Sequence, residues 1–260
     1  METWTTRNIP PQQDRRAVIT GATGGLGYET ALALAGAGAE VVLTGRNAAK
    51  GAAALAKIRA AYPQSIIRYA DLDLADLASV KAFADRFADE HDMLDLLVNN
   101  AGVLSVCPVA EMALAEWRRV MEVNATGTFL VSRAVVRRMI AAERGGSLVS
   151  IASIAGKRGN PKLAHYSASK FAVVGFTQAL AQEVAAHGIR VNAVCPGLVE
   201  TAMIDDLNAA LGASVPEWLR HQAIRRSQTP ADIAWAVACL HGAQSVTGQS
   251  VNVDGGTLFD

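Results

Sequence analysis

The sequence predicts an α/β protein built as one domain, with a doubly wound sheet of seven parallel strands and helices on both of its faces. The first observation behind this prediction is a rhythm in which short apolar runs alternate with stretches whose Ala and Leu residues recur at a helical period. The second is that such alternation joins parallel strands through helical crossovers. The third is size, because 260 residues with 51% hydrophobic content suffice for one large core.

Seven short apolar runs account for the expected strands. The run at 16–20 ends abruptly in glycines, which is typical of a buried strand followed by a tight turn. The expected strands cover 16–20, 40–44, 65–71, 94–99, 147–151, 190–195 and 250–253. Helices are expected at 26–36, at 116–139 and from about Tyr166 onward. The polar, proline-bearing residues 1–14 are expected to form a flexible extension, with the single domain at 15–260.

Charge and cysteine content argue against several classes of function. Lys and Arg number 24 and Asp and Glu number 24, so no excess positive charge attracts nucleic acid or a membrane surface. Cys107, Cys195 and Cys239 lie far apart without a Cys-x-x-Cys motif, which argues against a disulfide framework and a metal site. The N-terminus lacks the pattern of a signal peptide and no run is long enough to span a bilayer, so we expect a cytoplasmic protein.

A glycine-rich turn leads from the first expected strand into a helix. Glycines stand at Gly21, Gly25 and Gly27, with Thr23 and Leu26 between them. One glycine permits the tight turn and one lets a pyrophosphate approach the backbone. The last lets the helix pack on the strand while its N-terminal amides face the anion. An ordinary strand-to-helix turn can also contain glycines, so this turn does not decide for a nucleotide by itself.

The end of the second expected strand indicates which dinucleotide is preferred. An acidic side chain there would accept hydrogen bonds from the free ribose hydroxyls of NAD. This chain instead has Gly45 followed by Arg46, a small residue that leaves room and a guanidinium that can meet a 2′-phosphate. The pattern favours NADP(H) over NAD(H), with Arg46 as a merely solvated residue at the start of a helix as the alternative.

Tyr166 and Lys170 lie four residues apart on a predicted helix and therefore on one face of it. A nearby cation favours the phenolate and would lower the tyrosine pKa from about 10, which would make Tyr166 usable as a general acid or base. Such a pair is also common on helix surfaces, so its context matters. Ser153 lies thirteen residues upstream, beyond a buried strand, where its hydroxyl can bind the carbonyl oxygen that Tyr166 protonates.

Together these motifs resemble the short-chain dehydrogenase/reductase family from about Arg16 to Gly256. The resemblance rests on the order and spacing of the matching segments. They are the turn at 20–27, Asn-Asn-Ala-Gly at 99–102, Asn124, Ser153, Tyr166 with Lys170, Pro196-Gly197, and Val-Asp-Gly-Gly at 253–256. The resemblance implies a Rossmann fold and an enzyme that transfers hydride with a nicotinamide dinucleotide.

The resemblance also implies a role for each matching residue. Tyr166 would be the catalytic acid/base, Lys170 would lower its pKa and hold the nicotinamide ribose, and Ser153 would position the substrate oxygen. Asn124 would anchor a water that links Lys170 to solvent. The implied cofactor contacts are Gly21, Thr23, Gly25, Leu26, Gly27, Arg46, Asp73, Leu74, Asn100, Ala101, Gly102, Tyr166, Lys170, Pro196, Gly197, Val199 and Thr201.

Some assignments rest on finer comparisons. Asp71 and Asp73 both stand at the end of the third strand, and Asp73 is preferred because Asp73-Leu74 fits the family's Asp-apolar step. His165 receives at most a place in the pocket wall. The segment between Glu200 and Ser227 has apolar residues at helical spacing and is either core or a substrate lid, and the resemblance favours a lid.

The predicted function is an NADP(H)-preferring oxidoreductase that interconverts a carbonyl and a secondary alcohol of a small molecule with an apolar portion. One alternative is an NAD-dependent polyol or hydroxy-acid dehydrogenase. Another is a non-catalytic NADP-binding sensor, which would not need Ser153, Tyr166 and Lys170. The first third of the chain looks like the retinol-dehydrogenase-like branch and the remainder like oxoacyl-reductase-like members, so the substrate stays open. The resemblance implies a homodimer or homotetramer built on the helices that contain Asn124 and Tyr166.

Overall fold

The computed structural model describes residues 5–212 and 214–259. Within this part of the chain, seven parallel strands form one sheet in the order β3-β2-β1-β4-β5-β6-β7. The strands are β1 (Arg16–Ile19), β2 (Glu40–Gly45), β3 (Ile67–Asp71), β4 (Leu96–Asn99), β5 (Gly146–Ile151), β6 (Ile189–Pro196) and β7 (Ser250–Val253). The chain runs outward from β1 to β3 and returns to β4 on the other side of β1, which confirms the predicted doubly wound Rossmann fold.

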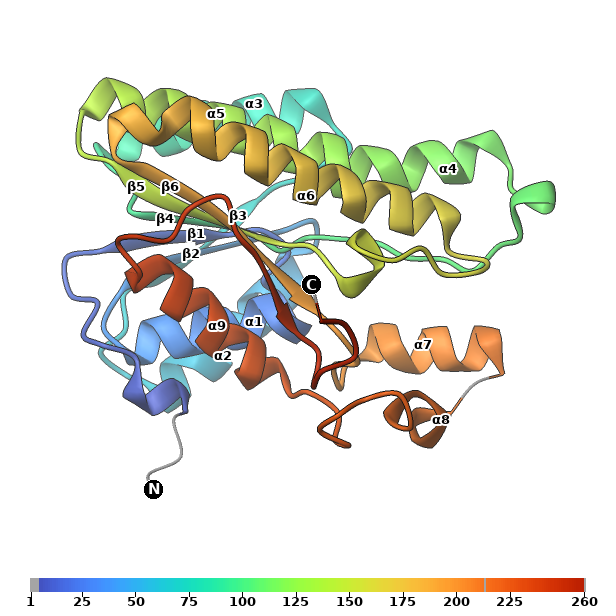
Figure 1. The fold of residues 1–260 in the computed structure, drawn as a ribbon. Coiled ribbons are helices and arrows are strands. Elements are labelled where there is room, and N and C mark those ends of the chain that lie inside the picture. The colour runs from blue at the N-terminus through green and yellow to red at the C-terminus, as the bar shows by residue number, and fades with distance from the viewer. Residues whose placement is uncertain (1–4, 213, 260) are drawn as a thin grey trace.

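Helices cover both faces of this sheet, as Figure 1 shows. Helices α3, α4, α5 and α6 lie over one face, and α1, α2 and α9 lie over the other. The α-helices are α1 (Gly25–Gly36), α2 (Ala48–Ala61), α3 (Leu77–Glu90), α4 (Leu114–Met121), α5 (Gly127–Ala142), α6 (Ala164–Val184), α7 (Ala202–Leu211), α8 (Val215–Leu219) and α9 (Pro230–Gly242). Among the described residues, no helix combines the length and the apolar character that crossing a bilayer requires.

Two large hydrophobic clusters and a small third one fill the space between the sheet and its helix layers. Ala17 and Ile19 of β1 pack in one cluster with Leu34 of α1, whereas Val18 packs in the other with Val131 of α5. Successive strand residues point to opposite faces, so a strand buried on both faces must be apolar throughout. Burying a side chain such as Ile19 contributes about 1.5–3 kcal/mol.

The helix predicted at 116–139 is interrupted in the structure. Helix α4 ends at Met121, a π-helical turn follows over Glu122–Thr126, and α5 continues from Gly127. A π turn holds one more residue than an α turn, which rotates the side chains that follow it, and such turns often occur at functional sites. Asn124 lies inside this turn. The interruption has no counterpart in the hydrophobic period, which is why the sequence predicts one continuous helix.

Part of the predicted flexible extension packs against the domain. Ile9 is only 9% exposed and belongs to the cluster under α1 and α9. The backbone N–H of Gln12 donates to the carbonyl oxygen of Ala37, 2.8 Å away. The Ile9 side chain and the Gln12 hydrogen bond thus attach this part of residues 5–14 to the domain, while the boundary between extension and domain stays a prediction. Residues 1–4 lie outside the described residues.

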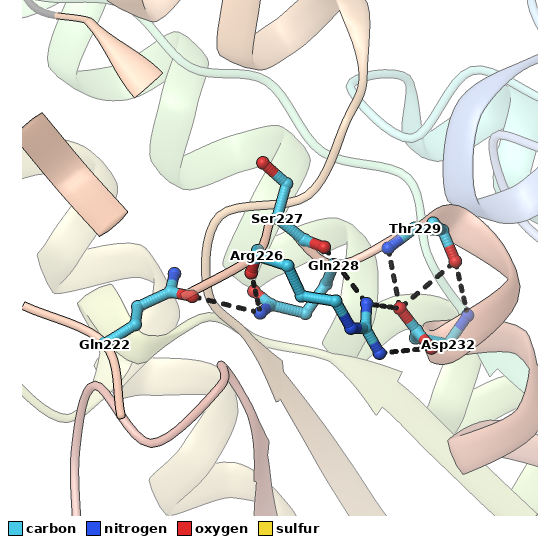
Figure 2. Close-up of polar contacts among 6 residues, drawn as sticks. All are labelled: Gln222, Arg226, Ser227, Gln228, Thr229 and Asp232. Carbon is cyan, nitrogen blue, oxygen red and sulfur yellow. Dashed lines mark hydrogen bonds and ion pairs between the residues drawn. The ribbon is translucent and has the colours of Figure 1, made fainter. Parts of the chain in front are cut away.

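The segment between Glu200 and Ser227, which was predicted to be a lid, has its two ends side by side. The N–H of Glu200 donates to Gln228 O at 3.0 Å, and the N–H of Gln228 donates to Leu198 O at 2.8 Å. Figure 2 shows how α9 is anchored just after the segment: Arg226 lies against the carboxylate of Asp232, with an Nη1 to Oδ2 distance of 2.8 Å. The Asp232 carboxylate also forms a capping box with Thr229 at the start of α9. Helices α7 and α8 are thus carried on a closed loop beside the carboxyl ends of the strands.

Candidate active site

The glycine turn after β1 has the backbone conformation that its sequence predicts. Gly21 and Gly25 have φ angles of 64° and 56°, in the left-handed region that favours glycine. A Cβ atom on Gly21 would lie 2.8 Å from the Cα of Ala101, and one on Gly27 would lie 2.8 Å from the oxygen of Gly21. Side chains at these positions would force the turn apart, so the close packing of strand, turn and helix requires glycine.

The N-terminus of α1 is open to an anion. Its N-cap, Gly24, makes no side-chain capping hydrogen bond, so the first backbone N–H groups of the helix keep their donor capacity. Gly24 and Gly25 are exposed, and no atom of the described chain lies within 4 Å of a Cβ placed on either. Thr23 and Leu26 are half-buried beside them. The turn therefore fits a pyrophosphate, which the amides and the positive end of the helix dipole would hold.

Residues after β4 hold the glycine turn in place. The side-chain amide of Asn100 donates to Thr20 O and Gly21 O, at 2.9 and 3.1 Å. The Thr20 hydroxyl accepts from the backbone N–H groups of Asn100 and Ala101, at 3.0 and 3.1 Å. Asn100 and Ala101 were predicted from the sequence only as cofactor contacts, and this bracing was missed. Thr20, at the end of the first apolar run, was the available signal.

Arg46 and Asp73 face each other at the carboxyl ends of β2 and β3. Arg46 Nη1 lies 3.9 Å from Asp73 Oδ2, and their side chains are 64% and 40% exposed. An exposed ion pair contributes about 0–1 kcal/mol, so Arg46 can leave it to bind a phosphate. Leu74, by contrast, is only 7% exposed and packs against Gly127, so its side chain belongs to the core.

Ser153 and Tyr166 meet beyond the end of β5. Ser153 caps a short 3-10 turn, where its Oγ accepts from the N–H of Ala155 at 3.1 Å, and its hydroxyl is hydrogen-bonded to the Tyr166 phenol. Burial raises the pKa of Tyr166, and the Ser153 hydrogen bond lowers it to a smaller extent. Burial and Ser153 are the causes that act on the phenol in the nucleotide-free protein, so the expectation that Lys170 lowers this pKa stays a prediction.

Lys170 is a buried cation. It is 4% exposed, its Nζ donates to the carbonyl oxygen of Ile151 at 2.8 Å, and it lies 5.7 Å from the centroid of the Tyr166 ring. Burial lowers the pKa of Lys170 from 10.5 to about 8, because the charged form loses its hydration. The ammonium is thus close enough to the phenol to share a ligand with it.

Asn124 connects the π-helical turn to the loop after β4. Its Oδ1 accepts from the N–H of Val103 at 2.8 Å, and its Nδ2 donates to Val103 O at 2.9 Å and to Ser169 Oγ at 3.0 Å. We call the two bonds to Val103 the amide bracket. A Cβ on Gly102 would lie 3.4 Å from Asn124 Oδ1 and 3.5 Å from Lys170 Nζ. Gly102 therefore lets the loop, the amide and the ammonium approach one another.

Comparison with known proteins identifies the family of this chain. Residues 15–212 match the sequence profile of the family described as short chain dehydrogenase. The chain belongs to the short-chain dehydrogenase family. As a member of that family it is an oxidoreductase, which confirms the resemblance predicted from the motifs.

Relatives in the short-chain dehydrogenase family extend over nearly the whole chain. A 3-oxoacyl-[acyl-carrier-protein] reductase of Synechocystis is 37% identical over 249 residues, covering 94% of this chain and 96% of its own. A 3-alpha-(or 20-beta)-hydroxysteroid dehydrogenase of Mycobacterium bovis is 37% identical over 244 residues, covering 93% and 88%. The solved structure of levodione reductase superposes with a TM-score of 0.89 at 30% identity, covering 94% and 97%. A putative NAD(P)-dependent gluconate 5-dehydrogenase from Beutenbergia cavernae, solved with NADP at low occupancy, gives 0.88 at 36%, again covering 94% and 97%.

The remaining residues predicted from the family resemblance lie at the end of β6. A Cβ on Gly197 would lie 2.7 Å from the Cβ of Asp254, so the strand end packs tightly on the residue after β7. Val199 is 4% exposed, and Thr201 Oγ1 donates to Val199 O at 3.3 Å. Thr201 is the N-cap of α7 without a capping side-chain bond. Pro196 closes β6 itself.

The predicted site residues thus divide into four groups. Asn124, Ser153, Tyr166 and Lys170 form one polar cluster, to which the loop at Gly102 belongs. The glycine turn forms a second group with Asn100 and Ala101. Arg46 and Asp73 form a third group at the ends of β2 and β3, and residues 196–201 at the end of β6 form a fourth. The contacts of Ser169, which lies between the tyrosine and the lysine, were missed, although its position in that motif was a signal.

Proposed function

We propose that this chain is an NADP(H)-preferring oxidoreductase that interconverts a carbonyl and a secondary alcohol, with Tyr166 as acid/base. The observation that carries the proposal is the polar cluster, in which a hydroxyl, a phenol and a buried ammonium lie together. They stand at the same sheet edge as a helix N-terminus that is open to a pyrophosphate.

The dinucleotide supplies the hydride chemistry when it is bound, and the chain supplies its binding groups. The amides at the start of α1 would hold the pyrophosphate, and Arg46 would meet the 2′-phosphate after leaving Asp73. Lys170 would hydrogen-bond the nicotinamide ribose. Support for NADP comes from Arg46 and from the Beutenbergia cavernae structure, which contains NADP.

Ser153 and Tyr166 would act on the substrate oxygen. During reduction the Tyr166 phenol donates its proton to the oxygen that becomes the alcohol, and Ser153 donates a second hydrogen bond to the same oxygen. Removing one such donor typically slows turnover by about 10²–10³-fold. Lys170 lies close enough to stabilise the Tyr166 phenolate that is left. Asn124 holds the loop at Val103 beside Lys170.

A substrate with an apolar portion is favoured by the relatives, whose names refer to oxoacyl and steroid compounds. A second candidate, an NAD-linked polyol or hydroxy-acid dehydrogenase, is favoured by one observation. Arg46 already has a carboxylate partner in Asp73 and is 64% exposed, which is what a merely solvated arginine would show. The name of the gluconate 5-dehydrogenase refers to a polyhydroxy acid, which is the substrate class of this second candidate.

The proposal includes a homodimer or homotetramer. Three large aromatic side chains on the layer of α4, α5 and α6 remain exposed in the described part of the single chain, namely Trp117 at 37%, Phe129 at 41% and Phe171 at 46%. Exposed aromatic side chains gathered on one layer fit a surface that a second copy covers. Light scattering coupled to gel filtration would measure the mass, and a monomer at micromolar concentration would contradict this part.

The deciding experiment titrates the purified protein with NADPH and NADH by fluorescence and then screens ketones and alcohols with the better cofactor. Tyr166→Phe serves as the matched variant, because it removes one hydroxyl from the cluster. We expect NADPH to bind more tightly than NADH, and Tyr166→Phe to bind NADPH normally and lose at least about 10³-fold in turnover. A variant that retains most of its turnover would refute the acid/base assignment, and preference for NADH would favour the second candidate.

A further inference from the structure

Four hydrogen-bonded side chains beside the polar cluster join α6, the loop after β4 and α4. We call them the polar row: His165, Ser105, Glu116 and Arg119. His165, which precedes Tyr166 on α6, is 0% exposed, and its Nε2 lies 2.7 Å from the Oγ of Ser105. Ser105 belongs to the loop after β4, and its hydroxyl also donates to the carboxylate of Glu116 on α4. Arg119 holds that carboxylate in turn, with its Nε and Nη2 at 2.8 and 2.6 Å from the two oxygens.

The protons available in the polar row decide which atom donates each hydrogen bond. Hydrogen bonds from Arg119 and Ser105 hold the pKa of Glu116 at about 2, so the carboxylate is ionised at neutral pH and can only accept. The single proton of the Ser105 hydroxyl therefore points to Glu116. The Ser105 oxygen must then accept from His165, which assigns the ring proton of His165 to Nε2.

The second ring nitrogen of His165 decides how the polar row responds when the ring is protonated. Nδ1 of His165 is buried and has no hydrogen-bond partner among the described residues. In the neutral ring this atom is a lone pair, whereas in the imidazolium it would carry a buried proton without an acceptor. The charged groups that act on the ring are Glu116 and Arg119 of α4, and the loop contributes the uncharged Ser105. Burial, together with the Arg119 charge, outweighs the effect of Glu116 and lowers the pKa of His165, so the ring is neutral at pH 7.

The polar row attaches the middle of the loop of residues 102–107, and both ends of this loop are attached to neighbouring elements as well. The amide bracket holds the start of the loop of residues 102–107, next to Lys170. The backbone N–H of Cys107 donates to the carbonyl oxygen of Lys162, 2.9 Å away and just before α6. Ser105 lies between these attachments and is half-buried. Its contact with His165 therefore sets how closely the loop approaches the helix that carries Tyr166.

We propose that Ser105, His165 and Glu116 position the wall of the substrate pocket against Tyr166, and that they do so only while His165 is neutral. This rests on the proposed function, because it takes Tyr166 as the acid/base. The three are positioning residues, since they act through the loop and the helix and not on the reacting atoms. Breaking a hydrogen bond of the polar row frees the loop of residues 102–107. Substrate binding is then weakened more than the chemical step is slowed, so KM rises more than kcat falls.

Variants at His165 separate the hydrogen bond from the titration. His165→Gln keeps an uncharged N–H donor near the position of Nε2, and His165→Leu fills similar volume without a donor. Ser105→Ala removes the central hydroxyl. With NADPH and a ketone from the screen, we expect His165→Gln to stay within about threefold of the parent, while His165→Leu and Ser105→Ala raise KM about tenfold and change kcat less than about threefold.

The pH profile supplies a readout that a merely structural role would not move. Below pH 6.5, kcat/KM of the parent should fall, and that of His165→Gln should not, because glutamine does not titrate. Parental KM in both His165→Leu and Ser105→Ala, or an unchanged acid-side fall in His165→Gln, would overturn the proposal. If His165→Leu does not fold, the KM of Ser105→Ala and the profile of His165→Gln decide the question.

Failure of the proposed function gives a different result. In that case Tyr166→Phe keeps parental turnover, whatever the variants at Ser105 and His165 do. If instead Tyr166→Phe is inactive while these variants resemble the parent, only the positioning proposal is wrong. NADPH titration of every variant checks that the cofactor site is intact.

Discussion

Replacing Lys170 by methionine should make the nucleotide-free protein more stable while abolishing its activity. Lys170 is 4% exposed, and burial lowers its pKa from 10.5 to about 8. Because one pKa unit corresponds to about 1.4 kcal/mol, keeping this side chain charged costs the folded state about 3 kcal/mol at pH 7. Methionine has a similar length and removes that cost, but the carbonyl oxygen of Ile151 loses its donor, which costs about 1–2 kcal/mol.

The gain in folding stability of Lys170→Met should decrease as the pH rises. A lysine whose pKa is lowered on folding binds fewer protons in the folded than in the unfolded protein between pH 8 and 10.5. Its cost is therefore complete below pH 8 and disappears above pH 10.5. At pH 7, Lys170→Met should gain about 1–2 kcal/mol, which raises Tm by about 4 °C, and near pH 9.5 the gain should vanish.

Urea denaturation of parent and variant at the two pH values measures this difference. Lys57→Met is the matched control, because Lys57 lies exposed on α2 and its replacement should change the free energy of unfolding by less than about 0.5 kcal/mol at either pH. Loss of stability in Lys170→Met at pH 7, or a difference that does not change with pH, would refute the electrostatic reasoning. The variant should also lack turnover, since Lys170 belongs to the polar cluster.

Three further predictions concern other parts of the chain. Arg46→Asp should lower the affinity for NADPH about tenfold or more and improve that for NADH, and an unchanged ratio in the fluorescence titration would remove Arg46 from the cofactor site. His241 is 4% exposed, and burial together with Arg15 lowers its pKa from 6.5 to about 4. Its depressed pKa means that stability is complete above pH 6.5 and falls by up to about 3 kcal/mol as the pH drops to 4, so denaturation curves of His241→Leu at pH 7 and 4.5 should differ less than those of the parent. Gly21→Ala should lower Tm by about 4–8 °C and weaken nucleotide binding, because φ is 64° and the new Cβ would lie 2.8 Å from Ala101; melting curves with parental Tm would contradict this.

Strands and helices were predictable because the patterns that encode them are local. The third strand begins at Ile67 and not at residue 65, since pairing starts where Ile67 lies opposite Val41. The fourth begins at Leu96 and not at residue 94, although Leu94 is also buried. Apolar character thus marks where a strand lies, whereas its first residue depends on the neighbouring strand.

The π-helical turn was not predictable in the same way. Asn124 was recognised from the family motif, but an interrupted helix leaves no mark on the hydrophobic period around it. The turn is linked to the loop by the bonds that Asn124 makes to Val103, a residue 21 positions away in the sequence. Such a contact exists only after the sheet has brought the two segments together.

By itself, the sequence determined the doubly wound fold, the glycine turn and the identity of the Ser153, Tyr166 and Lys170 motif, since each depends on residues close together in the chain. Tertiary structure decided the electrostatics and the bracing of these groups. Ile151 accepts from Lys170 across 19 residues, and Ser105 meets His165 across 60. Burial raises the Tyr166 pKa, an effect that the spacing of Tyr166 and Lys170 along the helix does not reveal. Desolvation and long-range hydrogen bonds are properties of packed neighbours, and spacing along one helix carries no information about them.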